Sequence, residues 1–405
     1  MRCCHALELS GEHLLMISNV SNAQECYVWV WLPKQTQPVV AGHLAFSHQQ
    51  VAFTYGRSYL RNPEAIPLSP VGLPLRAGTT YPSGMKVLPS CLRDAGPDAW
   101  GRRVIDYRYP QLNANEIDYL LLSSSNRIGA LDFQASAQIY SPRLATSLHL
   151  KHIDYFAGLA EEQATIDQHL ALLFLHGTSI GGARPKCMIV HQDRECIAKF
   201  SLSTDFYPII KTEYIAMKLA QYVGLSVAEV AMVKQGKRDV LLVKRFDRTS
   251  QSKKENRRLM LSALSLLDLD EMEARYASYL DLADCVRKHF VDPIATLTEL
   301  FSRLVFNVLI GNTDDHARNH AAFWEGEYCE LTPAYDLCPQ MRIGQEATQA
   351  MAIGGAQGNL STVHNVLSVA QHFSLSSSQA REIVDHQIAT INKYWQPLCD
   401  EKGSA

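Results

Sequence analysis

Hydrophobic residues in this chain change their spacing near residue 250, and the change separates two unlike parts of the sequence. Before it, short apolar runs typical of β-strands surround a helix predicted over 212–223. These runs are 187–190, 196–200, 227–233 and 239–243. After it, apolar residues recur at helical spacing, most clearly over 299–310, and that helix is expected to end at Gly311. The pattern predicts an α+β chain whose last part is helical.

The chain length agrees with more than one domain. With 405 residues, about 150 residues per domain allows roughly two to three. The first hundred residues look β-rich, with a hairpin predicted between 43–46 and 51–55. A charged stretch at 248–258 is predicted to be a polar loop, and 152–174 to be a helix. The expected division is a β-rich subdomain at 1–100, an α/β nucleotide-binding lobe at 101–250 and a helical catalytic lobe at 251–405.

Composition argues against some classes of protein. The 38 Lys and Arg against 41 Asp and Glu give a net charge of −3, so a dedicated binder of nucleic acid or anionic membrane is not expected. Ten scattered cysteines contain no Cys-x-x-Cys pair, and no run of about 20 apolar residues occurs. We therefore expect a reduced, cytoplasmic protein with no membrane partner.

Two features in the α/β part could bind phosphate. Residues 176–186 are rich in glycine and end in Lys186, but they match neither the Walker pattern nor Gly-x-Gly-x-x-Gly, and taken alone a plain connecting loop explains them better. Lys199 ends a predicted strand, and Glu213 lies in the next helix. A strand lysine held by a helix glutamate is how protein kinases place a charge on nucleotide phosphates, although a surface Lys and Glu are common.

Two further features follow the most apolar helix. Asn319 follows Asp314 by five positions, the spacing of a kinase catalytic loop, and Asp336 follows later as a second metal-binding candidate. A polar turn at the helix exit gives the same residues. His316 and His320, four apart, could instead share a helix face in a metal site, but the Glu of His-Glu-x-x-His is absent. All these features appear in the order found in kinases, which favours a phosphotransferase.

Taken together, several short stretches of the sequence resemble the HipA family of toxin serine/threonine kinases. In the second half they are 178–186, 243–248, 312–319 and 335–337, and in the first half 65–69, 97–103 and 127–131. The resemblance covers essentially the whole chain. It implies a HipA-like, protein-kinase-related two-lobed fold, with a mixed α/β N-terminal domain, an all-helical C-terminal domain, and ATP and Mg²⁺ between them.

The resemblance also implies roles for individual residues. Asp314 would be the catalytic base, Asn319 and Asp336 would bind Mg²⁺, and Ser179 would be autophosphorylated, which should expel its loop from the site. The residues implied to bind ATP are Gly181, Gly182, Ala183, Arg184, Lys186, Lys199, Glu213, the hinge Lys244, Arg245 and Phe246, and His316, Asn319, Tyr335 and Asp336.

Partners follow from the same resemblance. A helix-turn-helix antitoxin of the HipB type would bind the chain and bring it to DNA, so that DNA contact is indirect. The protein substrate would be an aminoacyl-tRNA synthetase, the glutamyl enzyme first, and its phosphorylation would arrest growth, as in persistence. A small-molecule or lipid kinase on the same core, or a mainly non-enzymatic co-repressor partner, are the alternatives.

Overall fold

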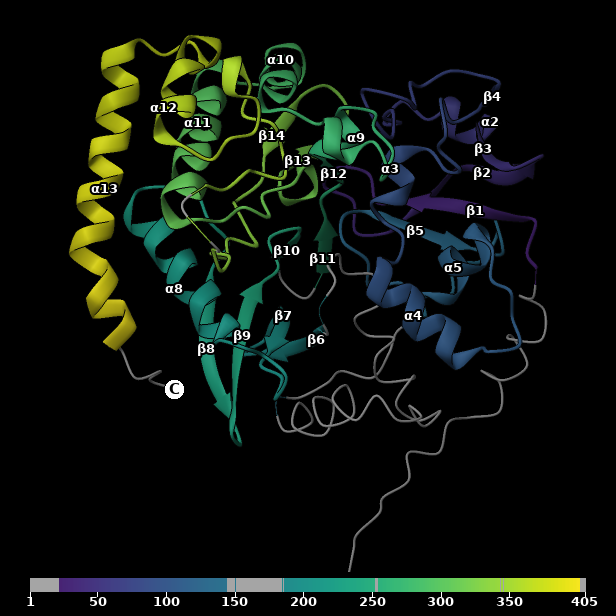
Figure 1. The fold of residues 1–405 in the computed structure, drawn as a ribbon. Coiled ribbons are helices and arrows are strands. Elements are labelled where there is room, and N and C mark those ends of the chain that lie inside the picture. The colour runs from purple at the N-terminus through teal and green to yellow at the C-terminus, as the bar shows by residue number, and fades with distance from the viewer. Residues whose placement is uncertain are drawn as a thin grey trace, which may run out of the picture.

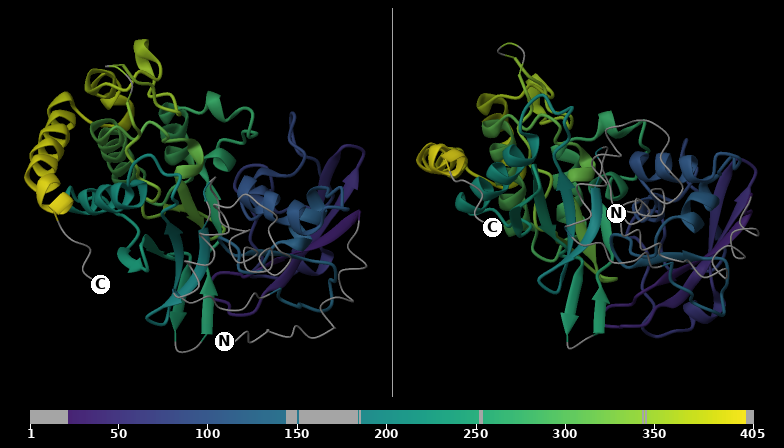
Figure 2. Two further views of the ribbon diagram at one scale, coloured as in Figure 1. Left: turned by 60° about the horizontal axis from the view of Figure 1, so that its bottom comes forward. Right: turned by 90° about the horizontal axis from the view of Figure 1, so that it is seen from below.

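The structure, a computed structural model, describes residues 22–143, 150, 184, 186–251, 254–342, 344 and 346–400. Within these residues the strands form sheets of five, four, three and two strands. The five-stranded sheet lies at one side of the molecule and the long C-terminal helix α13 at the other (Figure 1), and the two further views keep this separation (Figure 2).

The five-stranded sheet is built from the N-terminal part of the chain in the order β4-β3-β2-β1-β5. Its strands are β1 (Glu25–Val30), β2 (Val39–Ser47), β3 (Gln50–Tyr55), β4 (Thr79–Thr80) and β5 (Leu131–Gln134). The helices of this part are α2 (Arg57–Leu60), α3 (Ser90–Arg93), α4 (Ala99–Arg108) and α5 (Glu116–Leu122). β2 and β3 pair antiparallel with Ser47 opposite Gln50, which confirms the predicted hairpin.

The four-stranded sheet carries the strands predicted between 187 and 243, in the order β6-β7-β9-β8. Its elements are β6 (Lys186–His191), β7 (Arg194–Phe200), α8 (Ile209–Tyr222), β8 (Val230–Gln235) and β9 (Arg238–Lys244). Alternate residues of β9 enter different cores: Leu241 and Val243 pack with α8, whereas Val240 and Leu242 pack with α4. The sheet is therefore covered by a helix on each face, with α4 coming from the N-terminal part.

Helices dominate the C-terminal part, and a small sheet is added to them. Its elements are β12 (Met260–Ser262), α9 (Ala263–Leu266), η3 (Ala274–Tyr276), α10 (Tyr279–His289), α11 (Pro293–Ile310), η4 (Ala317–Asn319), β13 (Ala321–Trp324), β14 (Cys329–Leu331), η5 (Gly355–Gln357), α12 (Val363–Ser368), η6 (Ala370–Phe373) and α13 (Ser377–Asp400). The sheet has the order β12-β13-β14. The sequence pattern predicted only helices here, because strands of three or four residues are too short to show periodicity.

Helix α11 leads directly into the loop that carries Asp314 and Asn319. Asp292 caps its first turn by accepting a hydrogen bond from Ala295 N at 3.0 Å, and Gly311 ends it in the left-handed region with φ of 72°. By length and hydropathy α11 could cross a membrane. Several of its apolar residues, including Leu300, Phe301 and Leu304, are instead completely buried in the core of this fold.

The expectation of a loop was wrong in one place, and the expectation of one helix concerns residues that the structure does not describe. The stretch 248–258 was predicted to be a polar loop, but β10 (Arg248–Gln251) pairs with β11 (Lys254–Arg257) as an antiparallel hairpin. Both strands consist of polar residues, so hydrophobic alternation did not mark the hairpin. The predicted helix at 152–174 lies outside the described residues.

Candidate active site

The position of Lys199 follows from strand alternation. Lys199 has the same parity in β7 as Ile197, which packs in the α8 core, so its side chain lies on the α8 face of the sheet. Its Nζ lies 2.6 Å from Glu213 Oε1 on α8 and 2.5 Å from Asp336 Oδ1. The pairing of Lys199 with Glu213 that the sequence suggested is present, and Asp336 joins it across 137 residues of chain.

These contacts determine the charges of the cluster formed by Lys199, Glu213 and Asp336. Burial alone would lower the pKa of Lys199, but Asp336 and Glu213 outweigh burial and raise it above its usual value. Lys199 in turn lowers the pKa of Asp336 to about 2. At neutral pH the cluster therefore holds a lysine cation directly beside the Asp336 carboxylate.

Asp336 also has an unusual backbone. Its φ of 59° lies in the left-handed region, where residues other than glycine are uncommon. Such a conformation costs on the order of 1 kcal/mol and is found where function demands a particular side-chain direction. Nothing in the local sequence marks this conformation.

The loop after α11 brings the other acidic and amide groups to the same place. Asp314 is exposed, and Asn319 Nδ2 donates to the Asp314 carbonyl at 3.1 Å, closing the loop on itself. Partial burial, with Asp336 and Asp315 nearby, raises the pKa of Asp314, while His316 opposes the rise. His316 also acts on Asp336, so Asp314, His316 and Asp336 lie in one electrostatic neighbourhood.

A buried network supports this loop from behind. Asp315 accepts hydrogen bonds from His320 Nε2 at 2.9 Å and from the Tyr279 hydroxyl. Tyr279 Oη also lies 3.2 Å from His320 Nε2. His316 and His320 flank the short turn η4 rather than share a helix face, so the alternative of a His-x-x-x-His metal pair has no support from geometry.

Tyr279→Phe should destabilise the loop after α11, because it removes the hydroxyl that contacts Asp315. Removing a buried hydroxyl that contacts a buried carboxylate costs about 1–2 kcal/mol in the free energy of unfolding. Thermal unfolding should therefore show a lower midpoint for Tyr279→Phe, whereas Tyr276→Phe, on an exposed ring, should match the wild type. Equal midpoints for all three proteins would contradict a supporting role for this network.

Two of the three side chains of the predicted hinge are engaged away from the cluster. Backbone N–H groups of Lys244 and Arg245 donate to Glu229 O and Glu195 O. Lys244 Nζ pairs with Glu229 at 2.6 Å, and the Arg245 side chain is buried against Asp247. Of the three, only Phe246 faces another predicted site residue: its ring centroid lies 5.9 Å from that of Tyr335.

The glycine-rich segment is described only at its end. Ser179, Gly181, Gly182 and Ala183 lie outside the described residues. Arg184 pairs with Asp205 at 2.7 Å. Lys186 begins β6 directly opposite Lys199 in β7, and its Nζ lies 3.6 Å from Asp98 Oδ2. Asp98 belongs to a string, 97–103, for which sequence reasoning named no site residue.

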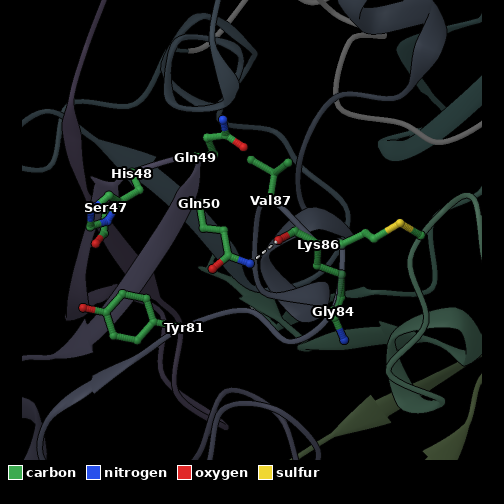
Figure 3. Close-up of a pocket in the computed structure, with 9 residues that line it drawn as sticks. Ser47, His48, Gln49, Gln50, Tyr81, Gly84, Lys86 and Val87 are labelled. Atoms are coloured by element: carbon green, nitrogen blue, oxygen red, sulfur yellow. Dashed lines mark hydrogen bonds between the residues drawn. The ribbon is translucent and has the colours of Figure 1, made fainter.

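A cavity of about 510 Å³ lies elsewhere, in the N-terminal part (Figure 3). Gln50 lies at this cavity and donates to the carbonyls of Lys86 and Pro82 at 3.0 and 3.1 Å. The lining residues are Ser47, His48, Gln49, Gln50, Tyr81, Gly84, Met85, Lys86 and Val87. None of the predicted site residues is among them, so the charged cluster is the better candidate for chemistry.

Comparison with known families accounts for both parts of the chain. A family model described as the HipA N-terminal domain matches residues 30–134, and one described as the HipA-like C-terminal domain matches residues 178–395. The second match alone covers more than half of the chain. The chain belongs to the HipA family.

Two relatives are similar to part of the chain. The serine/threonine-protein kinase toxin HipA of Shewanella oneidensis is 27% identical over 200 residues, 43% of this chain and 46% of the relative. A putative kinase of Haemophilus influenzae is 25% identical over 179 residues, 40% of this chain and 52% of the relative. These matches thus span about half the length of the relatives.

A solved HipA structure shares the fold. The structure of HipA with HipB and operator DNA from Shewanella oneidensis MR-1 superposes with a TM-score of 0.66, covering 89% of both chains at 19% identity. The predicted HipA-like two-lobed fold is therefore confirmed. At this identity the likeness concerns the fold alone.

Proposed function

We propose that this HipA-family chain is an ATP-dependent serine/threonine protein kinase of toxin type. The observation that carries the proposal is the position of Lys199, which lies between Glu213 on α8 and Asp336 beyond β14. A lysine held by a helix glutamate and facing a second-lobe aspartate is the arrangement that kinases use to hold nucleotide phosphates. Family membership supports the same activity.

The donor set fits a nucleotide with Mg²⁺. The Asp336 carboxylate and the Asn319 amide oxygen are hard oxygen donors of the kind that Mg²⁺ prefers. Asn319 Nδ2 donates to the Asp314 carbonyl, so it is the amide oxygen that would bind the metal. Lys186 and Lys199, paired across neighbouring strands, would face the phosphates, and the bound metal would neutralise charge on them.

The chain's own groups would then do three things. Lys199 and Lys186 would bind and orient the phosphate chain. This would lower the activation barrier, because the reacting groups are already held in position. Asp314, exposed on its loop, would orient the substrate hydroxyl and accept its proton. Backbone groups of Lys244, Arg245 and Phe246 would hold the adenine, with Tyr335 and His316 lining the site.

The proposed partners are a helix-turn-helix antitoxin and a protein substrate. A HipB-like antitoxin would neutralise the kinase and take it to operator DNA, which suits a chain with a net charge of only −3. The proposed substrate is an aminoacyl-tRNA synthetase, the glutamyl enzyme first, in the cytoplasm. Autophosphorylation of Ser179 would add nearly two negative charges to a loop meant to hold phosphates and switch the kinase off.

Transfer of labelled phosphate tests the proposal. The full chain is incubated with Mg²⁺ and γ-labelled ATP, alone, with glutamyl-tRNA synthetase and with a cell lysate, and Lys199→Met serves as the inactive control. We expect label on the chain itself and on the synthetase. Label on a metabolite but never on protein would favour a small-molecule kinase, and the absence of Mg-ATP binding in calorimetry would favour a non-enzymatic co-repressor partner.

A further inference from the structure

The N-terminal part of the chain contributes a carboxylate to the charged cluster. Asp98 precedes α4, and its side chain is 5% exposed. Asp98 Oδ1 accepts the capping hydrogen bond of α4 from Gly101 N at 2.7 Å. Asp98 Oδ2 is buried, makes no hydrogen bond to the described residues, and lies 3.6 Å from Lys186 Nζ.

Packing fixes where Asp98 lies. Trp100 and Val104 of α4 are buried against Cys187 of β6 and Ala198 of β7, in the core on one face of the nucleotide-lobe sheet. The helix that starts at Asp98 is therefore anchored to the same two strands that carry Lys186 and Lys199. Asp98 cannot leave its position without pulling Trp100 out of that core.

The charges explain why a carboxylate is needed at this point. Lys186 and Lys199 are direct cross-strand partners, and two like charges in that relation repel each other. Lys199 has Glu213 at 2.6 Å, whereas Lys186, 3% exposed, has Asp98. Burial lowers the pKa of Lys186, and Asp98 opposes this by favouring the charged form. The positive charge of Arg318, in the loop after α11, also favours the carboxylate form of Asp98 by lowering its pKa.

We propose that Asp98 is a positioning residue that holds Lys186 for the nucleotide phosphates, as Glu213 holds Lys199. This inference rests on the proposed kinase function and adds to it that the ATP site is incomplete without the N-terminal part of the chain. Asp98 acts through Lys186 and touches no reacting atom itself.

The substitution Asp98→Asn separates charge from structure. Asparagine caps a helix about as well as aspartate, so α4 and its packing should persist while the charge beside Lys186 is lost. Asp98→Asn takes a negative charge away from the buried Lys186 side chain, which should then turn toward Asp336. The matched control is Asp106→Asn, on the exposed face of the same helix, where Asp106 accepts a hydrogen bond from Tyr119 Oη at 2.6 Å.

Calorimetry with the full chain measures Mg-ATP and, as a phosphate-free probe, adenosine. Asp98→Asn should weaken Mg-ATP binding about tenfold and leave adenosine binding unchanged, because only the phosphates need Lys186. Asp98→Asn combined with Lys186→Met should bind Mg-ATP no more weakly than Lys186→Met alone, since the two residues act as one unit. Asp106→Asn should match the wild type.

Two kinds of failure are distinguishable. If the wild type binds Mg-ATP and Asp98→Asn binds it equally well, or if Mg-ATP and adenosine affinities fall together, the positioning role of Asp98 is overturned and the kinase proposal stands. Additive effects in the double variant would overturn it as well. A wild-type chain that binds no Mg-ATP would overturn the proposed function and this inference with it.

Discussion

Asp314→Asn should lower the rate of phosphate transfer about 10³-fold, the range expected for loss of a general base. The amide has the shape of the carboxylate but cannot accept a proton from the substrate hydroxyl. Asp314 is exposed at the start of the loop, so its replacement removes no buried contact. The measurement is the initial rate of label transfer to protein, together with the affinity for Mg-ATP, which should change little.

A matched control comes from the same lobe. Asp292→Asn replaces the exposed cap of α11, where asparagine keeps the hydrogen bond to Ala295 N. Its transfer rate should equal that of the wild type. An Asp314→Asn rate within tenfold of the wild type would remove Asp314 from the role of base, because such a loss is smaller than proton transfer contributes.

The pH dependence gives a second readout for Asp314. Burial, with Asp336 and Asp315, raises the pKa of Asp314 above its usual value of 3.8. Only the carboxylate can act as a base, so the transfer rate should be full above this raised pKa and be lost as the pH falls through it. The residual rate of Asp314→Asn should lack this acid limb; an unchanged limb would place its origin in another group.

Local pattern was enough to predict the parts of the cluster that depend on short segments. The alternation in β7 and the periodicity of α8 put Lys199 and Glu213 on facing surfaces, and their 2.6 Å contact follows from adjacent elements. The αL termination at Gly311 and the Asp314–Asn319 loop follow equally from the end of an apolar helix. Contacts between elements close in sequence leave a signal that a single sequence can carry.

Other parts of the cluster depend on how distant segments pack. Asp98 reaches Lys186 only because α4 covers one face of the four-stranded sheet, and no spacing in the sequence encodes that packing. The inward direction of the Arg245 side chain depends on partners in the N-terminal part, including Asn126 at 2.6 Å. The left-handed backbone of Asp336 is likewise stabilised by its surroundings rather than by its neighbours in sequence.

Asp247→Asn should lower the free energy of unfolding by about 3 kcal/mol. It removes a buried negative charge at the junction between the N-terminal part and the predicted hinge at 244–246. Asp247 accepts from Arg245 at 2.7 Å and from Arg248 at 2.8 Å, and all three side chains are almost completely buried. Asp247 also accepts from Gly129 N at 2.7 Å. Gly129 has φ of 79°, and a Cβ there would lie 3.1 Å from Met260 N, so that loop cannot easily adjust.

The loss should appear as a lower midpoint in thermal or urea unfolding at neutral pH, by about 5 °C in the thermal case. Glu229→Gln is the matched control: it breaks a pair with Lys244 at the end of β9, but the Glu229 side chain is 65% exposed, so the midpoint should hardly move. An Asp247→Asn midpoint equal to that of the control would mean that Arg245 and Arg248 find other partners at no cost.

Acid provides an independent check on the charge of Asp247. Burial alone would raise the pKa of Asp247, but Arg245 and Arg248 hold it well below 3.8. A carboxyl whose pKa is depressed by folding stabilises the folded state above its unfolded pKa, and this stabilisation is lost as the pH falls through the folded pKa. The difference in stability between wild type and Asp247→Asn should therefore be constant near neutrality and shrink only below about pH 4. A difference that persists undiminished in strong acid would trace the effect to packing of the amide rather than to the missing charge.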